Sequence, residues 1–200
     1  MSHRNTVAAA LALAAGLSVV ARASDTQTPR DADSMRGKLE LIVERGEQCP
    51  CPRPLSTTIT EREVNGYLRH HAAGDLPDGV VAPHVTIVGA GRVAGRAIVD
   101  LDRVRTSRQR GWLDPAAYLT GRLPVTATGI LHTRDGIGRF QFEAATVGGF
   151  AVSKSVLQEL LSYYSRSSED PDGLNLDDTF ELPAKIREIQ VGKSVAYVIQ

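Results

Sequence analysis

The sequence carries no excess of either charge and very little cysteine, and each shortage excludes a class of protein. Its 200 residues include 23 Lys and Arg against 23 Asp and Glu, which gives a formal net charge of +0. A nucleic-acid binder would show a basic excess, so we predict no nucleic-acid partner. The two cysteines, Cys49 and Cys51, supply only two ligands, which do not complete a metal site.

Motifs for catalysis and for metal binding are also missing. Four of the five histidines, His70, His71, His84 and His132, lie beyond residue 23 and show no H-E-x-x-H or comparable ligand spacing. No G-x-S-x-G elbow is present. We therefore predict no metal, no cofactor and no enzymatic activity. Because catalytic triads assemble from residues far apart in sequence, a small secreted hydrolase is kept as the third functional hypothesis.

One stretch resembles a dinucleotide-binding motif. Gly89, Gly91 and Gly95 follow an apolar run that begins at Val85. A dinucleotide fold requires a helix directly after such glycines, since the pyrophosphate lies at the helix N-terminus. Here Gly95 is followed by Arg-Ala-Ile-Val-Asp-Leu-Asp, which alternates with a period of two. We interpret Gly89 and Gly91 as a hairpin turn and Gly95 as a strand kink.

Residues 1–23 have the pattern of a secretory signal peptide. Arg4 is followed by an apolar run and by Ala21-Arg22-Ala23, an A-x-A-type cleavage site. We predict cleavage near Ala23 and a secreted or periplasmic protein. The alternative is an uncleaved anchor, for which the apolar run is short. Loss of Arg4 and Arg22 leaves 21 basic and 23 acidic residues, a net charge of about −2.

Residues 24–57 are expected to form a polar lead-in to the folded domain. Met35, Leu39 and Ile42 recur at helical spacing and indicate a short helix, after which Cys49-Pro50-Cys51 breaks regular structure. A disulfide between Cys49 and Cys51 closes a small ring that needs a bent backbone. We favour this local disulfide; pairing with another molecule and free thiols are the alternatives.

Two amphipathic helices are predicted beyond this linker. Thr60 and Glu63 form a capping box at the start of the first helix, and Ser153 is the N-cap candidate of the second. Asn65 is expected to tie the first helix to a neighbouring backbone. The apolar stripes of the two helices consist of Val64, Tyr67 and Leu68 in the first and Val156, Leu157, Leu160, Leu161 and Tyr164 in the second.

Between and after the helices the sequence alternates as strands do. The expected strands are residues 84–89, 92–104, 122–133, 136–147, 180–191 and 194–200. Asp135-Gly136 is a two-residue hairpin signal, and interior glycines such as Gly95, Gly129 and Gly138 let a sheet curl. The predicted fold is one α+β domain, residues 58–200, in which a long curved antiparallel sheet wraps around two amphipathic helices.

The first helix also resembles a family motif. The matching residues are Thr58, Thr60, Glu61, Glu63, Val64, Asn65 and Leu68. With the order of elements from Thr58 to Gln200, they are similar to short bacterial envelope members of the tubular lipid-binding (TULIP-like) superfamily. The resemblance implies a lipid or other amphiphile held between helices and sheet, with the two apolar stripes as a hydrophobic groove. The alternative is that both stripes belong to the core.

A basic segment with an aromatic residue is the candidate membrane contact. Its residues are Arg105, Arg108, Arg110, Trp112 and Leu113. Arginines beside an exposed Trp suit a membrane interface and anionic headgroups. The alternative is a solvated loop anchored by one buried Trp.

These observations leave three hypotheses for function. The leading one is a non-catalytic binding protein for a lipid or other hydrophobic ligand, serving lipid transfer or chaperoning. The second is an envelope adaptor with a fully packed core and no ligand, and the third is the small secreted hydrolase. No oligomeric state is predicted.

Overall fold

The computed structural model describes residues 27–47, 53–74, 76, 79–106, 121–165, 172–173 and 175–200. The predicted signal peptide and Cys49 and Cys51 lie outside these residues. In chain order the elements are α1 (Pro29–Glu47), β1 (Ser56–Thr60), α2 (Glu61–His70), the 3-10 helix η1 (Ala72–Gly74), β2 (Val80–Gly89), β3 (Arg92–Asp100), α3 (Leu101–Thr106), β4 (Arg122–Arg134), β5 (Ile137–Val147), β6 (Phe150–Val152), α4 (Lys154–Ser165), β7 (Thr179–Glu181), β8 (Glu188–Val191) and β9 (Val195–Ile199).

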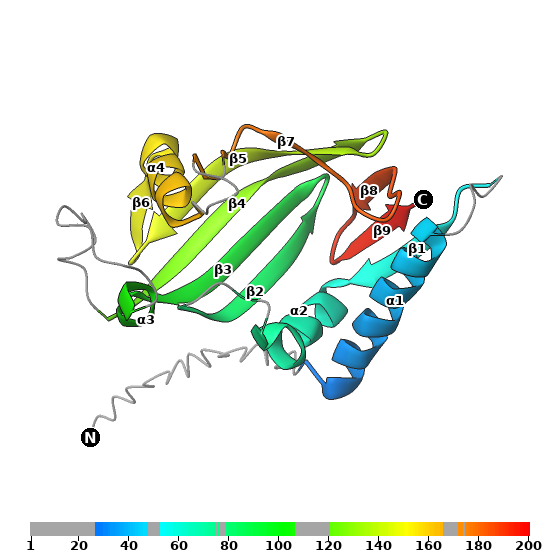
Figure 1. The fold of residues 1–200 in the computed structure, drawn as a ribbon, viewed down its shortest axis with the longest axis horizontal. Coiled ribbons are helices and arrows are strands. Elements are labelled where there is room, and N and C mark those ends of the chain that lie inside the picture. The colour runs from blue at the N-terminus through cyan, green and yellow to red at the C-terminus, as the bar shows by residue number, and fades with distance from the viewer. Residues whose placement is uncertain are drawn as a thin grey trace, which may run out of the picture.

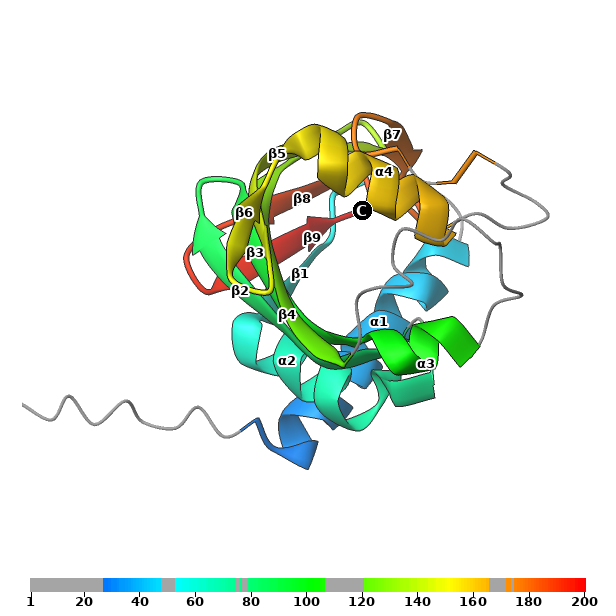
Figure 2. The same cartoon turned by 90° about the vertical axis from the view of Figure 1, so that its left-hand side faces the viewer.

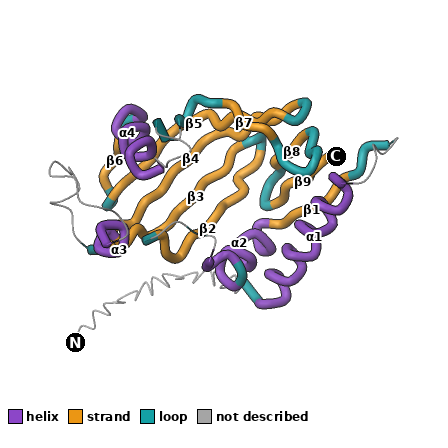
Figure 3. Tube along the Cα trace, in the orientation of Figure 1, coloured by secondary structure: helices purple, strands orange, loops and turns teal. Residues whose placement is uncertain are grey.

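The strands form two antiparallel sheets (Figure 1). The larger sheet has the order β2-β3-β4-β5-β6, with β7 paired to β5, and the smaller has the order β1-β9-β8. Seen along its length, the larger sheet is curved (Figure 2). α3 and α4 lie near one end of the long strands, and α2 lies beside β2 with α1 next to it, as the trace in Figure 3 shows. The predicted α+β class and the long antiparallel sheet are confirmed.

Local turn chemistry shapes the hairpins of the long sheet. β2 ends at Gly89 and β3 begins at Arg92, with positive φ at Gly89 and Gly91, so the glycine motif is the hairpin turn that the sequence predicts. At the next hairpin, Asp135 has φ 50° and Gly136 has φ 83°. Positive φ at both central residues is what a type I′ turn requires, and its twist matches that of the flanking strands.

Interior glycines of the long strands make room for phenylalanine rings. β4 and β5 shift register between Thr128 and Gly129, where a bulge bends the sheet. A Cβ on Gly129 would lie 2.4 Å from Cζ of Phe140, and a Cβ on Gly138 would lie 2.5 Å from Cε2 of Phe180. Gly95 differs, because a Cβ there would meet nothing within 4 Å.

The main hydrophobic core lies between α1 and the smaller sheet. Its buried residues come from α1, β1, β9 and the segment between β7 and β8: Met35, Ile42, Ile59, Leu182, Ile186 and Val198. Hydrogen bonds join this unit to the long sheet, since Ser194 N donates to Ile87 O at 2.8 Å and Gly91 N donates to Val191 O at 3.3 Å.

The packing of α1 corrects the expected lead-in. The helix has 19 residues rather than the few that were predicted, and its buried positions lie on one face: Ala32, Met35, Ile42 and Gly46. Gly46 allows the closest approach, because a Cβ there would lie 2.5 Å from Ala184 O. α1 therefore packs with β1 and with elements that follow it, and the predicted division into domains stays a prediction.

One expected strand ends early, and another is divided into two. The strand predicted over 92–104 stops at Asp100, and α3 begins at the next residue. The Asp100 carboxylate accepts a hydrogen bond from Arg103 N, in the first turn of α3, at 3.2 Å. Such a bond satisfies an amide that the first helical turn leaves free. The strand predicted over 180–191 is split into β7 and β8 by a turn in which Ala184 and Lys185 have positive φ.

Candidate functional site

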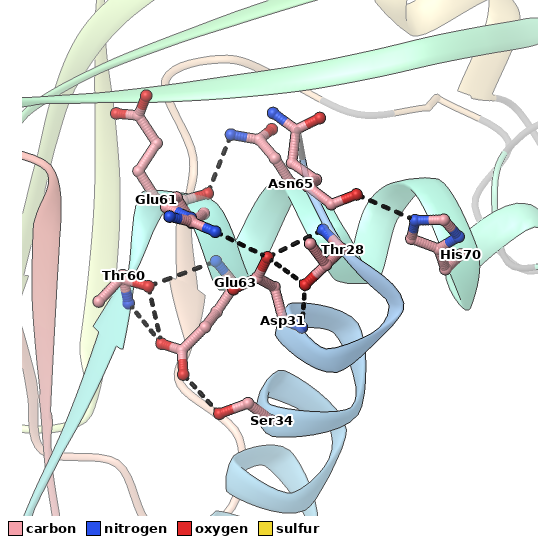
Figure 4. A network of polar contacts seen from close by, with 10 residues as sticks. Thr28, Asp31, Ser34, Thr60, Glu61, Glu63, Asn65 and His70 are labelled. Atoms are coloured by element: carbon pink, nitrogen blue, oxygen red, sulfur yellow. Dashed lines mark hydrogen bonds and ion pairs between the residues drawn. The ribbon is translucent and has the colours of Figure 1, made fainter. Parts of the chain in front are cut away.

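Helix α2 is held against the edge of the long sheet by the side chain of Asn65. Its Nδ2 donates to Val85 O at 2.7 Å and to Glu61 O at 2.9 Å, while Val85 N donates to its Oδ1 at 2.8 Å. The amide thus pairs with β2 as a neighbouring strand would. This confirms the structural role predicted for Asn65, which is buried (Figure 4).

Glu61 extends this pairing along the edge strand. Its Oε2 accepts a hydrogen bond from Ile87 N at 2.7 Å. Glu61 and Asn65 lie about one helical turn apart, roughly 6 Å along the axis, and Val85 and Ile87 lie about 6.6 Å apart along the strand. The two spacings match closely enough for side chains of α2 to satisfy the open edge of β2, which would otherwise be free to pair with another chain.

A buried carboxylate fixes α1 to the start of α2. Glu63 accepts hydrogen bonds from Ser34 Oγ at 2.6 Å, from Lys38 Nζ at 2.8 Å and from Thr60 N at 2.9 Å, and the predicted capping box is present. Burial raises the pKa of Glu63, but the hydrogen bonds from Lys38, Ser34 and Thr60 outweigh it and lower the pKa from 4.5 to about 2. Glu63 is therefore ionised at neutral pH and sets the position of α2.

A cavity of about 780 Å³ opens between α2 and the strands that it borders. Residues from the second half of α2, from the connection into β2 and from β2, β3 and β4 line it. The apolar residues that line it include Leu68, Leu76, Val80, Val81, Ile98 and Val125. Its polar side chains include Asn65, Arg69, His84, Arg96, Arg103 and Thr126.

Strand register arranges one wall of the cavity in two rows. His84 lies opposite Arg96, and Arg96 lies opposite Thr126. Val81 lies opposite Ile98, and Ile98 lies opposite Pro124. Directly opposed residues of antiparallel strands place their side chains on the same face, so a polar row and an apolar row run side by side across three strands. This wall is amphipathic.

The predicted groove residues of α2 have two different surroundings. Leu68 lines the cavity, but Val64 and Tyr67 pack against the main core. α4 contacts β5 and contributes no residue to the described lining of the cavity. Figures 1 and 2 show α2 and α4 well apart. Part of the α2 stripe thus faces α1 and the smaller sheet, and the single groove formed by both helical stripes stays a prediction.

The α4 stripe has mixed surroundings. Leu157 is buried and Leu161 is half-buried, whereas Val156 is 46% exposed. The side chains of Leu160 and Tyr164 lie outside the described part of the chain. Ser153 caps the helix as predicted, since Val156 N donates to Ser153 Oγ at 3.3 Å.

The candidate membrane contact falls largely outside the described residues. Arg108, Arg110, Trp112 and Leu113 are not among them, and only the backbone of Arg105 is described, in α3. Their predicted role stays a prediction.

Sequence reasoning missed the polar half of the cavity. Arg69 lies next to Leu68 and one turn after Asn65. The helical pattern alone does not distinguish it from an ordinary charged residue that faces solvent. Arg96 is an exposed residue of β3. Its neighbours His84 and Thr126 follow from register, which comes from pairing between strands and not from the local sequence.

Two further features are absent from the described residues. These residues contain no group of three or more His, Cys, Asp or Glu side chains that would hold a metal ion. None of the described helices combines the length and apolar character needed to cross a bilayer.

Comparison with known proteins adds little. No family model matches this chain, and no curated protein matches it. Among solved structures, the chain is similar to one described as "Crystal structure of lipopolysaccharide binding protein", with 17% sequence identity and a TM-score of 0.23. The match covers 73% of this chain but 40% of that one. A TM-score this low carries no argument, and membership of the TULIP-like superfamily stays a prediction.

Proposed function

We propose that the protein is a non-catalytic binding protein for a lipid or other amphiphile, held in the cavity beside α2. The observation that carries the proposal is this cavity, whose volume of about 780 Å³ falls within the range of small-molecule sites, about 300–1,000 Å³. Apolar residues of α2, β2, β3 and β4 meet there with a few convergent polar groups, as in most ligand sites.

The energetics favour a ligand with a substantial apolar part. Burial contributes about 0.8 kcal/mol per CH₂ group, so a ten-carbon tail supplies roughly 8 kcal/mol. Association costs roughly 4–15 kcal/mol in lost translational and rotational freedom and in ordering. A tail alone therefore binds weakly, and the polar groups of the lining supply the remainder.

The place of action follows from the N-terminal sequence. The signal-peptide pattern of residues 1–23 supports export. We therefore propose that the protein binds its ligand outside the cytoplasm. The family motif in α2 supports the same class of ligand. The groove that the resemblance implied, between the two helical stripes, is a different place from the cavity beside α2. Transfer between membranes and chaperoning of a lipid are both compatible with such a site.

Native mass spectrometry of protein purified gently from a bacterial periplasm tests the proposal. We expect a bound mass that is released on denaturation as a lipid or fatty acid. Leu68→Asp and Ile98→Asp place a charge in the apolar wall and should abolish it, while Val43→Asp, at a 52% exposed position of α1, should retain it. A clean apo mass that persists after incubation with phospholipid vesicles would rule out this function.

A second candidate, the envelope adaptor, is favoured by one observation. Phe150 is 79% exposed in the edge strand β6, close in sequence to the exposed Val156. Exposed apolar side chains at a sheet edge mark interaction sites. This candidate predicts a protein partner in pull-downs that Phe150→Ser loses, together with the clean apo mass.

A further inference from the structure

We propose that the cavity selects an anionic amphiphile, whose phosphate or carboxylate head lies at Arg69 and Arg96 and whose tail lies along Leu68, Val81 and Ile98. This inference rests on the proposed function, which it narrows from amphiphiles in general to acidic ones.

The charge of the lining is one-sided. Arg69, Arg96 and Arg103 line the cavity together with His84, and its described lining contains no Asp or Glu. The whole chain is electrically balanced, so this concentration of positive charge is local. A concave surface lined by one sign of charge raises the local concentration of ligands of the opposite sign.

Two of these arginines have no acidic partner. Elsewhere, Arg92 pairs with Glu143 at 2.7 Å and Arg122 with Asp100 at 3.1 Å. Neither the Arg69 nor the Arg96 side chain forms an ion pair or hydrogen bond with any described residue. Arg103 and His84 have contacts of their own, so the inference rests on Arg69 and Arg96.

Burial gives the ligand a direction. Arg69 and Arg96 are exposed, whereas Leu68, Val81 and Ile98 are half-buried. An acidic head therefore lies on the solvent side of the cavity and the tail lies along its apolar row. Guanidinium groups present a planar fork of donors that matches carboxylate and phosphate oxygens, and an uncharged head would leave both forks unused.

Calorimetric titration of the full-length secreted protein, freed of lipid, tests the inference with probes that share one tail. The probes are dodecyl phosphate, an uncharged dodecyl polyoxyethylene ether and inorganic phosphate, each detergent below its critical micelle concentration. The variants are Arg69→Gln, Arg96→Gln and the double variant. Arg139→Gln, an exposed arginine of β5 outside the lining, is the matched control.

We expect dodecyl phosphate to bind more tightly than the uncharged ether. Each arginine substitution should weaken the phosphate by about tenfold and leave the ether unchanged, so that the double variant removes the preference. An arginine with only a structural role would weaken both probes alike. Arg139→Gln should change neither affinity.

Three results would overturn the inference. Equal binding of both detergents, or a preference that survives in the double variant, would leave the proposed function standing without acidic selectivity. Inorganic phosphate binding as tightly as dodecyl phosphate would mean an anion site that makes no use of a tail. Absence of binding by either detergent would end both this inference and the proposed function.

Discussion

At the scale of single residues, glycine has different roles at positions that look alike in the sequence. Gly95 and Gly129 both lie inside long alternating strands. Gly129 is buried beneath the ring of Phe140 at a register shift, whereas Gly95 is exposed and has open space where a side chain would be. The local pattern is the same, and the difference comes from what the neighbouring strand places above each residue.

This contrast predicts opposite outcomes for the same substitution. Gly129→Ala sets a Cβ 2.4 Å from Cζ of Phe140 and 2.5 Å from Gln141 O, so we expect a loss of about 1–3 kcal/mol in unfolding free energy. Gly95→Ala meets nothing within 4 Å and should be neutral or stabilising by up to about 1 kcal/mol. Urea unfolding of both variants measures this, and equal destabilisation would contradict the packing described.

At the scale of elements, the long sheet is ordered by a helix at its edge, and that helix is held in turn by α1. Asn65 and Glu61 bind β2, while Glu63 binds Ser34 and Lys38 of α1. Leu68 and Arg69 of the same helix line the cavity. The position of the cavity wall therefore depends on a carboxylate that does not touch it.

The lowered pKa of Glu63 makes this attachment sensitive to acid. Its pKa falls from 4.5 to about 2 on folding, so its contribution to stability is complete above the unfolded value and is lost as pH falls from 4.5 toward 2. The full contribution is about 3 kcal/mol, of which about 2 kcal/mol is lost by about pH 3.

Urea unfolding near neutral pH and near pH 3 tests this dependence. Wild type should lose more unfolding free energy on acidification than Glu63→Gln, which keeps the shape of the side chain and lacks the titrating group. Glu188→Gln, at a carboxyl that binds no residue of α1, serves as the control. On acidification it should lose as much unfolding free energy as wild type. Identical acid losses in wild type and Glu63→Gln would mean that Glu63 is not the group responsible.

At the scale of the whole molecule, the main hydrophobic core of the described residues lies between α1 and the smaller sheet. The core residues Met35, Ile42, Ile59 and Val198 are all buried there. Along the long sheet, most apolar side chains are only half-buried. The proposed ligand site thus lies where apolar side chains are less fully buried, so a bound tail would add apolar contacts there.

Adjacent positions of α1 test whether this helix belongs to the core. Ile42 is 4% exposed and Val43 is 52% exposed. Ile42→Ala should lower the unfolding free energy by about 2–4 kcal/mol because it leaves a cavity, while Val43→Ala should change it by less than about 0.5 kcal/mol. Thermal or urea unfolding distinguishes them. If both substitutions changed the unfolding free energy by similarly small amounts, α1 would be a peripheral lead-in, as the sequence predicted, and not part of the core.

The sequence predicted what depends on near neighbours. The capping box of Thr60 and Glu63, the turn at Asp135-Gly136 and the alternation of β4 and β5 are local, and each is present. The packing of Met35 against Val198 and the row that Arg96 shares with His84 and Thr126 join residues far apart in the chain. Such contacts follow from register and tertiary packing, which one sequence does not specify at any single position.

The strand order of the smaller sheet has a consequence for the order in which the chain is made. β9 lies between β1 and β8, and it is added to the growing chain after every other described element. N-terminal units usually fold first during synthesis, but α1 and β1 have no central strand to pack on until Val198 has been added. The earliest elements to be synthesised must therefore remain open while the long hairpins are made, and they close around the last strand to arrive.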